Sequence, residues 1–209
     1  MAARHPPDAT RAGLPVLGFA TSTQFEAWLA AQPAGSPGLW LKLAKKGSGI
    51  PCLGKPAAIE AALCHGWIDG QLQPLDAQAW LVRFTPRKPR SNWSAVNRAT
   101  ALRLIDARRM APAGLAQVQA AQADGRWDAA YAPASQASVP ADLQQALDAD
   151  PAARAFFATL TGANRYAVLY RVQDAKTPAT RQKRIAQFVA MLARGEVLHP
   201  PRPKPGPPP

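Results

Sequence analysis

The residues with the clearest capacity for chemistry form one basic segment, RFTPRKPRSNWSAVN, which runs from Arg83 to Asn97. No acidic residue lies between Asp76 and Asp106, although that interval contains six cations: Arg83, Arg87, Lys88, Arg90, Arg98 and Arg103. Arginine offers forked donors that fit phosphate or carboxylate, and a helix that starts at Ser91 or Ser94 would add free backbone N–H groups. The segment therefore contains the parts of an anion-binding pocket.

This pattern predicts that an anionic small molecule or phosphate-bearing ligand binds at the basic segment. Lys45 and Lys46 follow a predicted strand and would join the site if that strand lies beside the segment. The alternative is a solvated basic surface, because cations in a proline-rich loop need no ligand. The expected ligand-binding residues are Lys45, Lys46, Arg83, Arg87, Lys88, Arg90, Ser91, Trp93, Ser94 and Asn97.

Tryptophans surround the basic segment and raise nucleic acid as a second kind of partner. Trp93 lies in the polar run SNWS, so we expect it at the surface, where it could stack on a nucleobase. Trp80 alternates with Val82 and Phe84, so we expect it in the core. A nucleic-acid-binding protein is therefore the main alternative to a small-anion binder.

Asp69 and Cys64 are the candidates for a catalytic role beside the arginines. Asp69 could act as a general base, although Asp followed by Gly is also common in turns. Cys64 ends a predicted helix among apolar neighbours, which favours an unreactive buried thiol, and His65 should point elsewhere. Cys52, Cys64 and His65 lack a standard zinc spacing. We expect no metal and no cofactor, and favour a non-enzymatic function while an enzyme of unknown reaction stays the third hypothesis.

Composition narrows the class of protein. The chain has 209 residues, 47% of them hydrophobic, and a formal net charge of +12, which favours polyanionic partners without choosing among them. No apolar stretch approaches the length of a membrane span, and the first residues lack the apolar core of a signal peptide. Two cysteines are too few for a disulfide framework, so we expect a cytoplasmic protein.

Hydrophobic periodicity and capping signals predict the elements that position these residues. The first helix is expected to begin with a capping box made by Thr23 and Glu26. The run TPRKPRSNWS, with two prolines, is expected to be extended. The other expected elements are a strand at 39–43, a helix between Pro56 and Gly66, a hairpin of residues 67–72 and 79–84, a helix ending near Arg109 and a helix from Pro112 to Gly125.

The composition of the sequence changes at a linker of Ala, Ser and Pro, and beyond it the pattern is helical throughout. Thr177 and Pro178 are expected to cap the last helix, whose apolar residues Ile185, Phe188, Val189 and Leu192 form one stripe. We predict an α+β protein, with a small mixed N-terminal domain that contains a β-hairpin and an all-helical C-terminal bundle. The expected boundaries are a disordered segment at 1–18, an α+β domain at 19–132, a linker at 133–139, a helical domain at 140–196 and a proline-rich disordered tail at 197–209.

Five strings, in this order, resemble the bacteriocin-protection family, also called YdeI or OmpD-associated: LWLKLAKKGSG, EAALCHGWIDG, RFTPRKPRSNWSAVN, RMAPAGL and AKTPATRQKRI. The resemblance covers about Phe19 to Gly195. It implies a role in stress resistance or in protection against antimicrobial peptides, and it supplies no catalytic residues. Some members are described as periplasmic, whereas the first residues of this sequence favour the cytoplasm. The helical part resembles the domain that defines the family.

Overall fold

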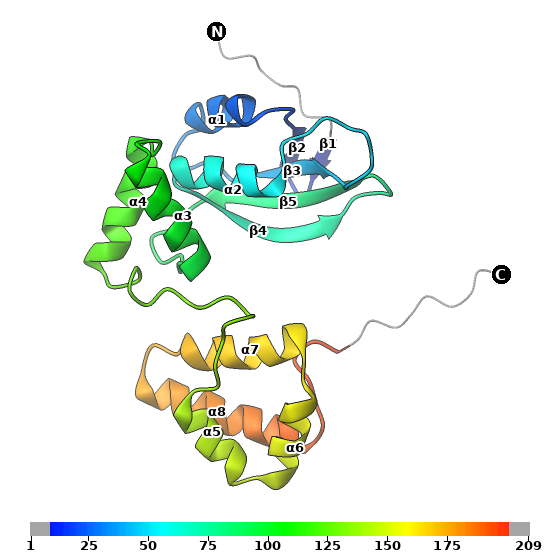
Figure 1. Ribbon diagram of the computed structural model, residues 1–209, viewed down its shortest axis with the longest axis vertical. Helices are drawn as coiled ribbons and strands as arrows, with labels where there is room; N and C mark the ends of the chain where they lie inside the picture. Colours follow the sequence, from blue (N-terminus) through cyan, green and yellow to red (C-terminus); the bar gives the residue numbers. More distant parts are fainter. Residues whose placement is uncertain (1–8, 201–209) are drawn as a thin grey trace, which may run out of the picture. The chain divides into compact units, whose positions relative to one another are not determined.

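The computed structural model describes residues 9–200, and the chain divides into two compact units, residues 1–130 and residues 131–209 (Figure 1). The predicted α+β class is confirmed, because a five-stranded sheet is followed along the chain by helices. The basic segment lies entirely in the first unit. Each unit has its own hydrophobic core.

The sheet of the first unit has the strand order β1-β2-β3-β5-β4. Only β2 and β3 pair in parallel; the other neighbours are antiparallel. The predicted hairpin is confirmed as β4 and β5. The strands are β1 Ala9–Arg11, β2 Leu14–Gly18, β3 Leu39–Ala44, β4 Trp67–Pro74 and β5 Ala79–Pro86.

The prediction of disorder over residues 1–18 is wrong for residues 9–18, which form β1 and β2. Leu14 and Val16 of β2 are buried against Trp40 and Leu81, which belong to strands far away in the sequence. A five-residue strand has too little internal pattern to predict, and pairing with β3 stabilises it. The first eight residues, and residues 201–209 of the predicted tail, lie outside the described part of the chain.

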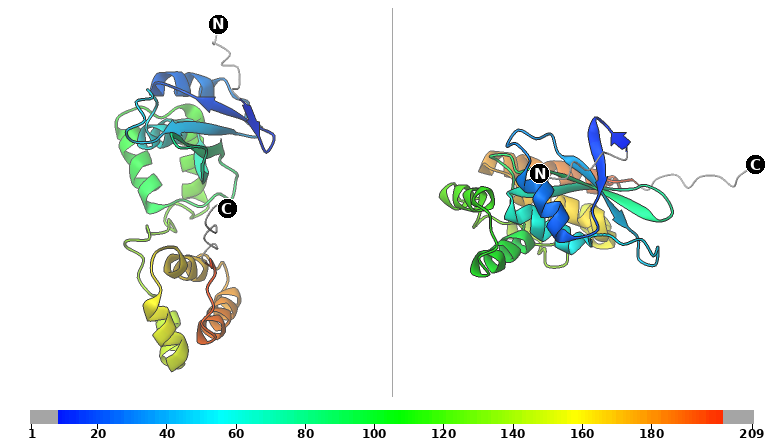
Figure 2. Two further views of the ribbon diagram at one scale, coloured as in Figure 1. Left: turned by 90° about the vertical axis from the view of Figure 1, so that its right-hand side faces the viewer. Right: turned by 90° about the horizontal axis from the view of Figure 1, so that it is seen from above.

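Four helices complete the first unit: α1 Ser22–Ala30, α2 Lys55–Cys64, α3 Ala95–Asp106 and α4 Pro112–Ala123. Helices α1 and α2 lie on the same face of the sheet (Figures 1 and 2) and bury Phe25 and Leu29 against Leu41 and Phe84. The capping box of α1 is made by Thr21 and Gln24, not by the predicted Thr23 and Glu26. The helix begins at Ser22, two residues earlier than a cap at Thr23 would give, because Thr21 has the extended backbone of a cap.

Two glycines allow α2 to pack and end where it does. Gly66 has a φ of 76°, the left-handed conformation that ends a helix, as predicted. Gly114 of α4 approaches α2 so closely that a Cβ there would lie 2.3 Å from the carbonyl oxygen of Cys64. The backbone N–H of Ala111 donates to the same oxygen over 3.0 Å. The end of α2 is therefore tied to the start of α4.

The described part of the second unit contains the helices α5 Ala141–Asp148, α6 Pro151–Thr159, α7 Gly162–Gln173 and α8 Pro178–Ala193. Asp150 caps α6 and Thr177 caps α8, each with a proline at the first helical position. The helices share one core, which includes Leu143, Phe157, Val172 and Leu192. The apolar stripe predicted for α8 lies in this core, with Ile185 and Phe188 buried.

Candidate anion-binding site

The basic segment begins as a strand and then turns. Strand β5 carries Arg83 and ends at Pro86, and residues Lys88 to Ser91 then form a β-turn in which the N–H of Ser91 donates to the carbonyl oxygen of Lys88 over 2.9 Å. Pro89 occupies the second turn position, where its fixed φ is favourable. The prediction of an extended run from Thr85 to Ser94 is therefore wrong beyond Arg87, because the hydroxyl of Ser91 also closes the turn by accepting from the N–H of Lys88 over 3.0 Å.

Arg87 is buried and does not face solvent as a ligand donor would. Its side chain is 6% exposed, and the guanidinium carbon lies 3.7 Å from the centre of the Trp93 ring. Its Nη1 donates to the carbonyl oxygen of Asn92 over 3.3 Å. A planar guanidinium can stack on an indole in this way, and the contact is strongest where water is excluded. Arg87 therefore acts as part of the core of the segment.

Trp93 is fully buried, so the prediction of a surface tryptophan is wrong. It is 1% exposed and packs edge-on against Trp127, with 4.9 Å between ring centres. Its cluster also includes Cys64 and Leu104, and so joins α2 to α3. The polar neighbours of Trp93 in the sequence obscured this burial, because the packing partners come from other elements. Trp93 cannot stack on a nucleobase in this arrangement.

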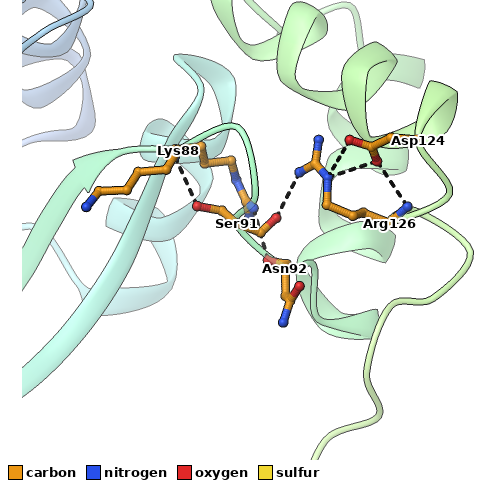
Figure 3. Close-up of polar contacts among 6 residues, drawn as sticks. Lys88, Ser91, Asn92, Asp124 and Arg126 are labelled. Carbon is orange, nitrogen blue, oxygen red and sulfur yellow. Dashed lines mark hydrogen bonds and ion pairs between the residues drawn. The ribbon is translucent and has the colours of Figure 1, made fainter. Parts of the chain in front are cut away.

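Arg126, which follows α4, stabilises the turn by a hydrogen bond to its backbone. Nη1 of Arg126 donates to the carbonyl oxygen of Ser91 over 2.9 Å, while its Nε lies 2.7 Å from a carboxylate oxygen of Asp124 (Figure 3). The carboxyl of Asp124 has a pKa below its ordinary value because Arg126 donates to it. Arg126 and Ser91 are 35 residues apart, and no local sequence pattern links them. This contact was therefore missed.

The start of α3 holds the other end of the segment. Ser94 caps the helix as one of the two predicted candidates, and its hydroxyl oxygen accepts from the N–H of Asn97 over 3.0 Å. Arg98 then donates to the carbonyl oxygen of Trp127 over 3.0 Å. The oxygens of Ser91 and Ser94 thus serve the local backbone. Arg83 is half-buried in β5, and its buried Nε donates to no described residue.

Lys88 and Arg90 are the exposed cations of the turn. Among residues 9–200, neither side chain forms an ion pair. Both lie on a backbone that is held by its own turn, by the stack of Arg87 on Trp93 and by Arg126. The segment therefore presents two unneutralised cations from a fixed loop.

Lys45 and Lys46 lie at the opposite end of β5 from the turn. The N–H of Lys45 donates to the carbonyl oxygen of Gln78, next to the first residue of β5, whereas the turn follows the last residue. Nζ of Lys45 donates to the carbonyl oxygen of Asp76 and lies 4.6 Å from the Trp80 ring centre. The structure does not bring these lysines to the basic segment, because β3 and β5 run antiparallel.

Trp80 is exposed to 38%, so the prediction that it lies in the core is wrong. It shares the alternation of Val82 and Phe84, but Trp80 is the second residue of β5 and is not part of the core cluster beneath α1 and α2.

Asp69 and Cys64 have separate environments. Asp69 of β4 lies 3.9 Å from Nζ of Lys55, in a half-exposed ion pair. Cys64 is buried, and burial raises the pKa of its thiol, so the uncharged form dominates at neutral pH. Burial likewise lowers the pKa of His65 and favours neutral imidazole. Cys64 does not supply an accessible thiolate. No group of three or more His, Cys, Asp or Glu side chains within residues 9–200 could hold a metal ion.

The two units of the chain match different family models. Residues 136–195 match the family model described as Bacteriocin-protection, YdeI or OmpD-Associated. The chain contains a domain of this family. The OmpD-associated domain thus covers α5 to α8. The sequence resemblance was expected to extend back to Phe19, but residues 17–117 match a different model, a domain of unknown function (DUF8412). The basic segment therefore lies outside the OmpD-associated domain.

The chain matches no curated protein and no solved structure. None of the helices in residues 9–200 is long and apolar enough to cross a membrane.

Proposed function

We propose that this protein binds a phosphate-bearing partner through Lys88 and Arg90, with the start of α3 beside them. The observation that supports this function is a pair of exposed cations, without acidic partners among the described residues, on a loop that the rest of the unit holds in place. Phosphate oxygens are matched by such cations and by the N–H groups at a helix start. The segment also has no acid of its own from residue 77 to residue 105.

A preformed loop favours binding because little entropy is lost when the partner arrives. The stack of Arg87 on Trp93 and the bond from Arg126 to Ser91 order the turn before any ligand is present. With Trp93 buried, a nucleic acid would be bound through its phosphates and without base stacking at this position. Binding of nucleic acid would then be insensitive to sequence.

Salt dependence tests the proposal directly. A fluorescently labelled single-stranded oligonucleotide and inorganic pyrophosphate are titrated against the full chain at several salt concentrations. Replacing both cations, Lys88→Ala with Arg90→Ala, should weaken binding of both probes. For the oligonucleotide it should reduce the slope of log affinity against log salt by about 1.4, since each phosphate contact in a single strand contributes about 0.7.

A matched control removes two exposed cations elsewhere. Lys183→Ala with Arg154→Ala takes the same charge from the second unit, so a non-specific effect of net charge would appear equally in both double variants. Equal losses would contradict a site at the turn. Retained pyrophosphate binding in the Lys88/Arg90 variant would contradict it as well.

A protective role is proposed only from the description of the OmpD-associated family. We place this role in the cytoplasm, which is compatible with the two free cysteines, Cys52 and Cys64. Deleting the gene should lower survival under antimicrobial-peptide stress, and restoring the wild-type chain, but not the Lys88/Arg90 variant, should recover it. Full recovery by the variant would separate protection from anion binding.

A further inference from the structure

Lys42 lies at the centre of the sheet on the face that α1 and α2 do not cover. It belongs to β3, the middle strand, where it pairs with Gly18 of β2 and Leu81 of β5. Its neighbours Leu41 and Leu43 are in the core beneath the helices, so strand alternation places Lys42 on the opposite face. Lys42 is half-buried, so its apolar stem can pack on this face while its ammonium remains accessible.

Two cavities adjoin Lys42. One, of about 220 Å³, is lined by Lys42 together with Phe19, Ile50 and Cys52. The other, of about 250 Å³, is lined by Lys42 and Arg11 together with Val16, Leu75 and Leu81. Among residues 9–200, no aspartate or glutamate lines either cavity. Neither Lys42 nor Arg11 forms an ion pair with any residue between positions 9 and 200.

The larger cavity combines these two cations with an apolar wall. Leu81 is fully buried behind it, while Leu75 is 38% exposed at the surface, and Ile50 beside the neighbouring cavity is 42% exposed. Leu75 and Ile50 thus add exposed apolar surface beside the two cavities. The indole N–H of Trp40 donates to the carbonyl oxygen of Arg11 over 3.1 Å and holds β1 at the edge of the cavity.

We propose that the cavity at Arg11 and Lys42 binds a small monocarboxylate with an aliphatic chain. The carboxylate would accept hydrogen bonds from the two cations, and the chain would lie against Val16, Leu75 and Leu81. About 250 Å³ corresponds to roughly eight water-sized volumes, which suits an acid with about eight non-hydrogen atoms. The apolar wall beside the two cations suits a carboxylate that carries an aliphatic chain better than inorganic phosphate, which has no apolar part to lie against it. This site is separate from Lys88 and Arg90.

Calorimetric titration of the full chain with hexanoate tests the proposal. Hexanol has a similar chain without the charge and should bind at least tenfold more weakly than hexanoate, because a charge-assisted hydrogen bond contributes about that factor or more. Inorganic phosphate has charge without the chain and should also bind at least tenfold more weakly, because it buries no apolar surface. In two-dimensional ¹H–¹⁵N spectra, hexanoate should shift the amides of Gly18 and Leu81 and the indole N–H of Trp40. Equal binding of hexanol and hexanoate, no binding of hexanoate, or shifts confined to residues 88–91 would overturn the proposal.

Single substitutions test whether Lys42 binds the carboxylate and which of the two cavities holds the ligand. Lys42→Met keeps the apolar stem and should weaken hexanoate binding at least tenfold, whereas the matched Lys46→Met should leave it unchanged. Gly18 borders the smaller cavity, and a Cβ there would lie 4.0 Å from the Cβ of Lys42, so Gly18→Ala fits without a clash. It should leave hexanoate binding in the larger cavity within about twofold of wild type. Unchanged affinity in a folded Lys42→Met protein would overturn the assignment.

Discussion

Two basic runs of this chain look alike in the sequence but differ in how their charge is balanced. Residues 181–184 of α8 read RQKR, and residues 86–90 at the end of β5 read PRKPR. In α8, Arg181 is paired with both carboxylate oxygens of Asp142, over 2.5 and 2.8 Å, and Arg184 lies 4.0 Å from Asp174. In the turn, Lys88 and Arg90 have no such carboxylate among the described residues.

The difference teaches that a run of cations does not by itself indicate a binding surface. Asp142 lies 39 residues from Arg181 and comes from another helix. Even within the turn, adjacent cations have different roles, because Arg87 is buried on Trp93 while Lys88 is exposed. The partners contributed by distant elements decide which charges remain available.

The largest loss of unfolding free energy is expected for substitution of Trp93, the buried residue against which Arg87 of the basic segment packs. Trp93→Ala should reduce the free energy of unfolding by about 3–5 kcal/mol, because it removes a buried ring from the cluster shared with Trp127 and Leu104. Chemical denaturation measures the loss, and Trp93→Phe should lose much less. A cost below about 1 kcal/mol for Trp93→Ala would show that the segment does not depend on this core.

Replacing Arg87 should lower the free energy of unfolding by less than replacing Trp93 does, and replacing its exposed neighbour Arg90 should leave it nearly unchanged. Arg87→Ala should reduce the free energy of unfolding by about 2 kcal/mol, the contribution of a desolvated cation–π contact. Arg87→Lys should recover little of it, because an ammonium cannot stack as a planar guanidinium does. Arg90→Ala should stay within about 0.5 kcal/mol of wild type. Similar losses of unfolding free energy for Arg87→Ala and Arg90→Ala would contradict the proposal that Arg87 stabilises the fold while Arg90 remains available to a ligand.

The smallest effect is expected for the ion pair of α8. Asp142→Asn should reduce the free energy of unfolding by less than about 1 kcal/mol at neutral pH, since the pair is partly exposed and screened. Hydrogen bonding from Arg181 lowers the pKa of Asp142 below its ordinary value of 3.8. The stabilisation should therefore be complete well above pH 3.8 and disappear as the pH falls through the lowered pKa.

Stability measured against pH for wild type and Asp142→Asn checks this expectation. The two curves should differ at neutral pH and converge in acid. Asp128→Asn is the control, because Asp128 is exposed and has no ion pair among residues 9–200. A difference between wild type and Asp142→Asn that grows in acid would contradict the assigned sign.

The sequence by itself determined the elements whose signals are local. The caps at Ser94 and Thr177, the terminating Gly66, the β4–β5 hairpin and the apolar stripe of α8 all depend on residues a few positions apart. The family resemblance was also readable from the sequence, and it is confirmed for residues 136–195.

Only the tertiary structure decided which residues are buried around the basic segment and which charges are free. Trp93 is buried and Trp80 is exposed, the reverse of the expectation, because Trp127 and Leu104 pack against Trp93, while Trp80 lies near the start of β5 outside the core cluster beneath α1 and α2. Lys45 was separated from the turn by the antiparallel direction of β3 and β5. Burial and ion pairing depend on partners that folding brings together from distant positions, and local sequence patterns do not encode them.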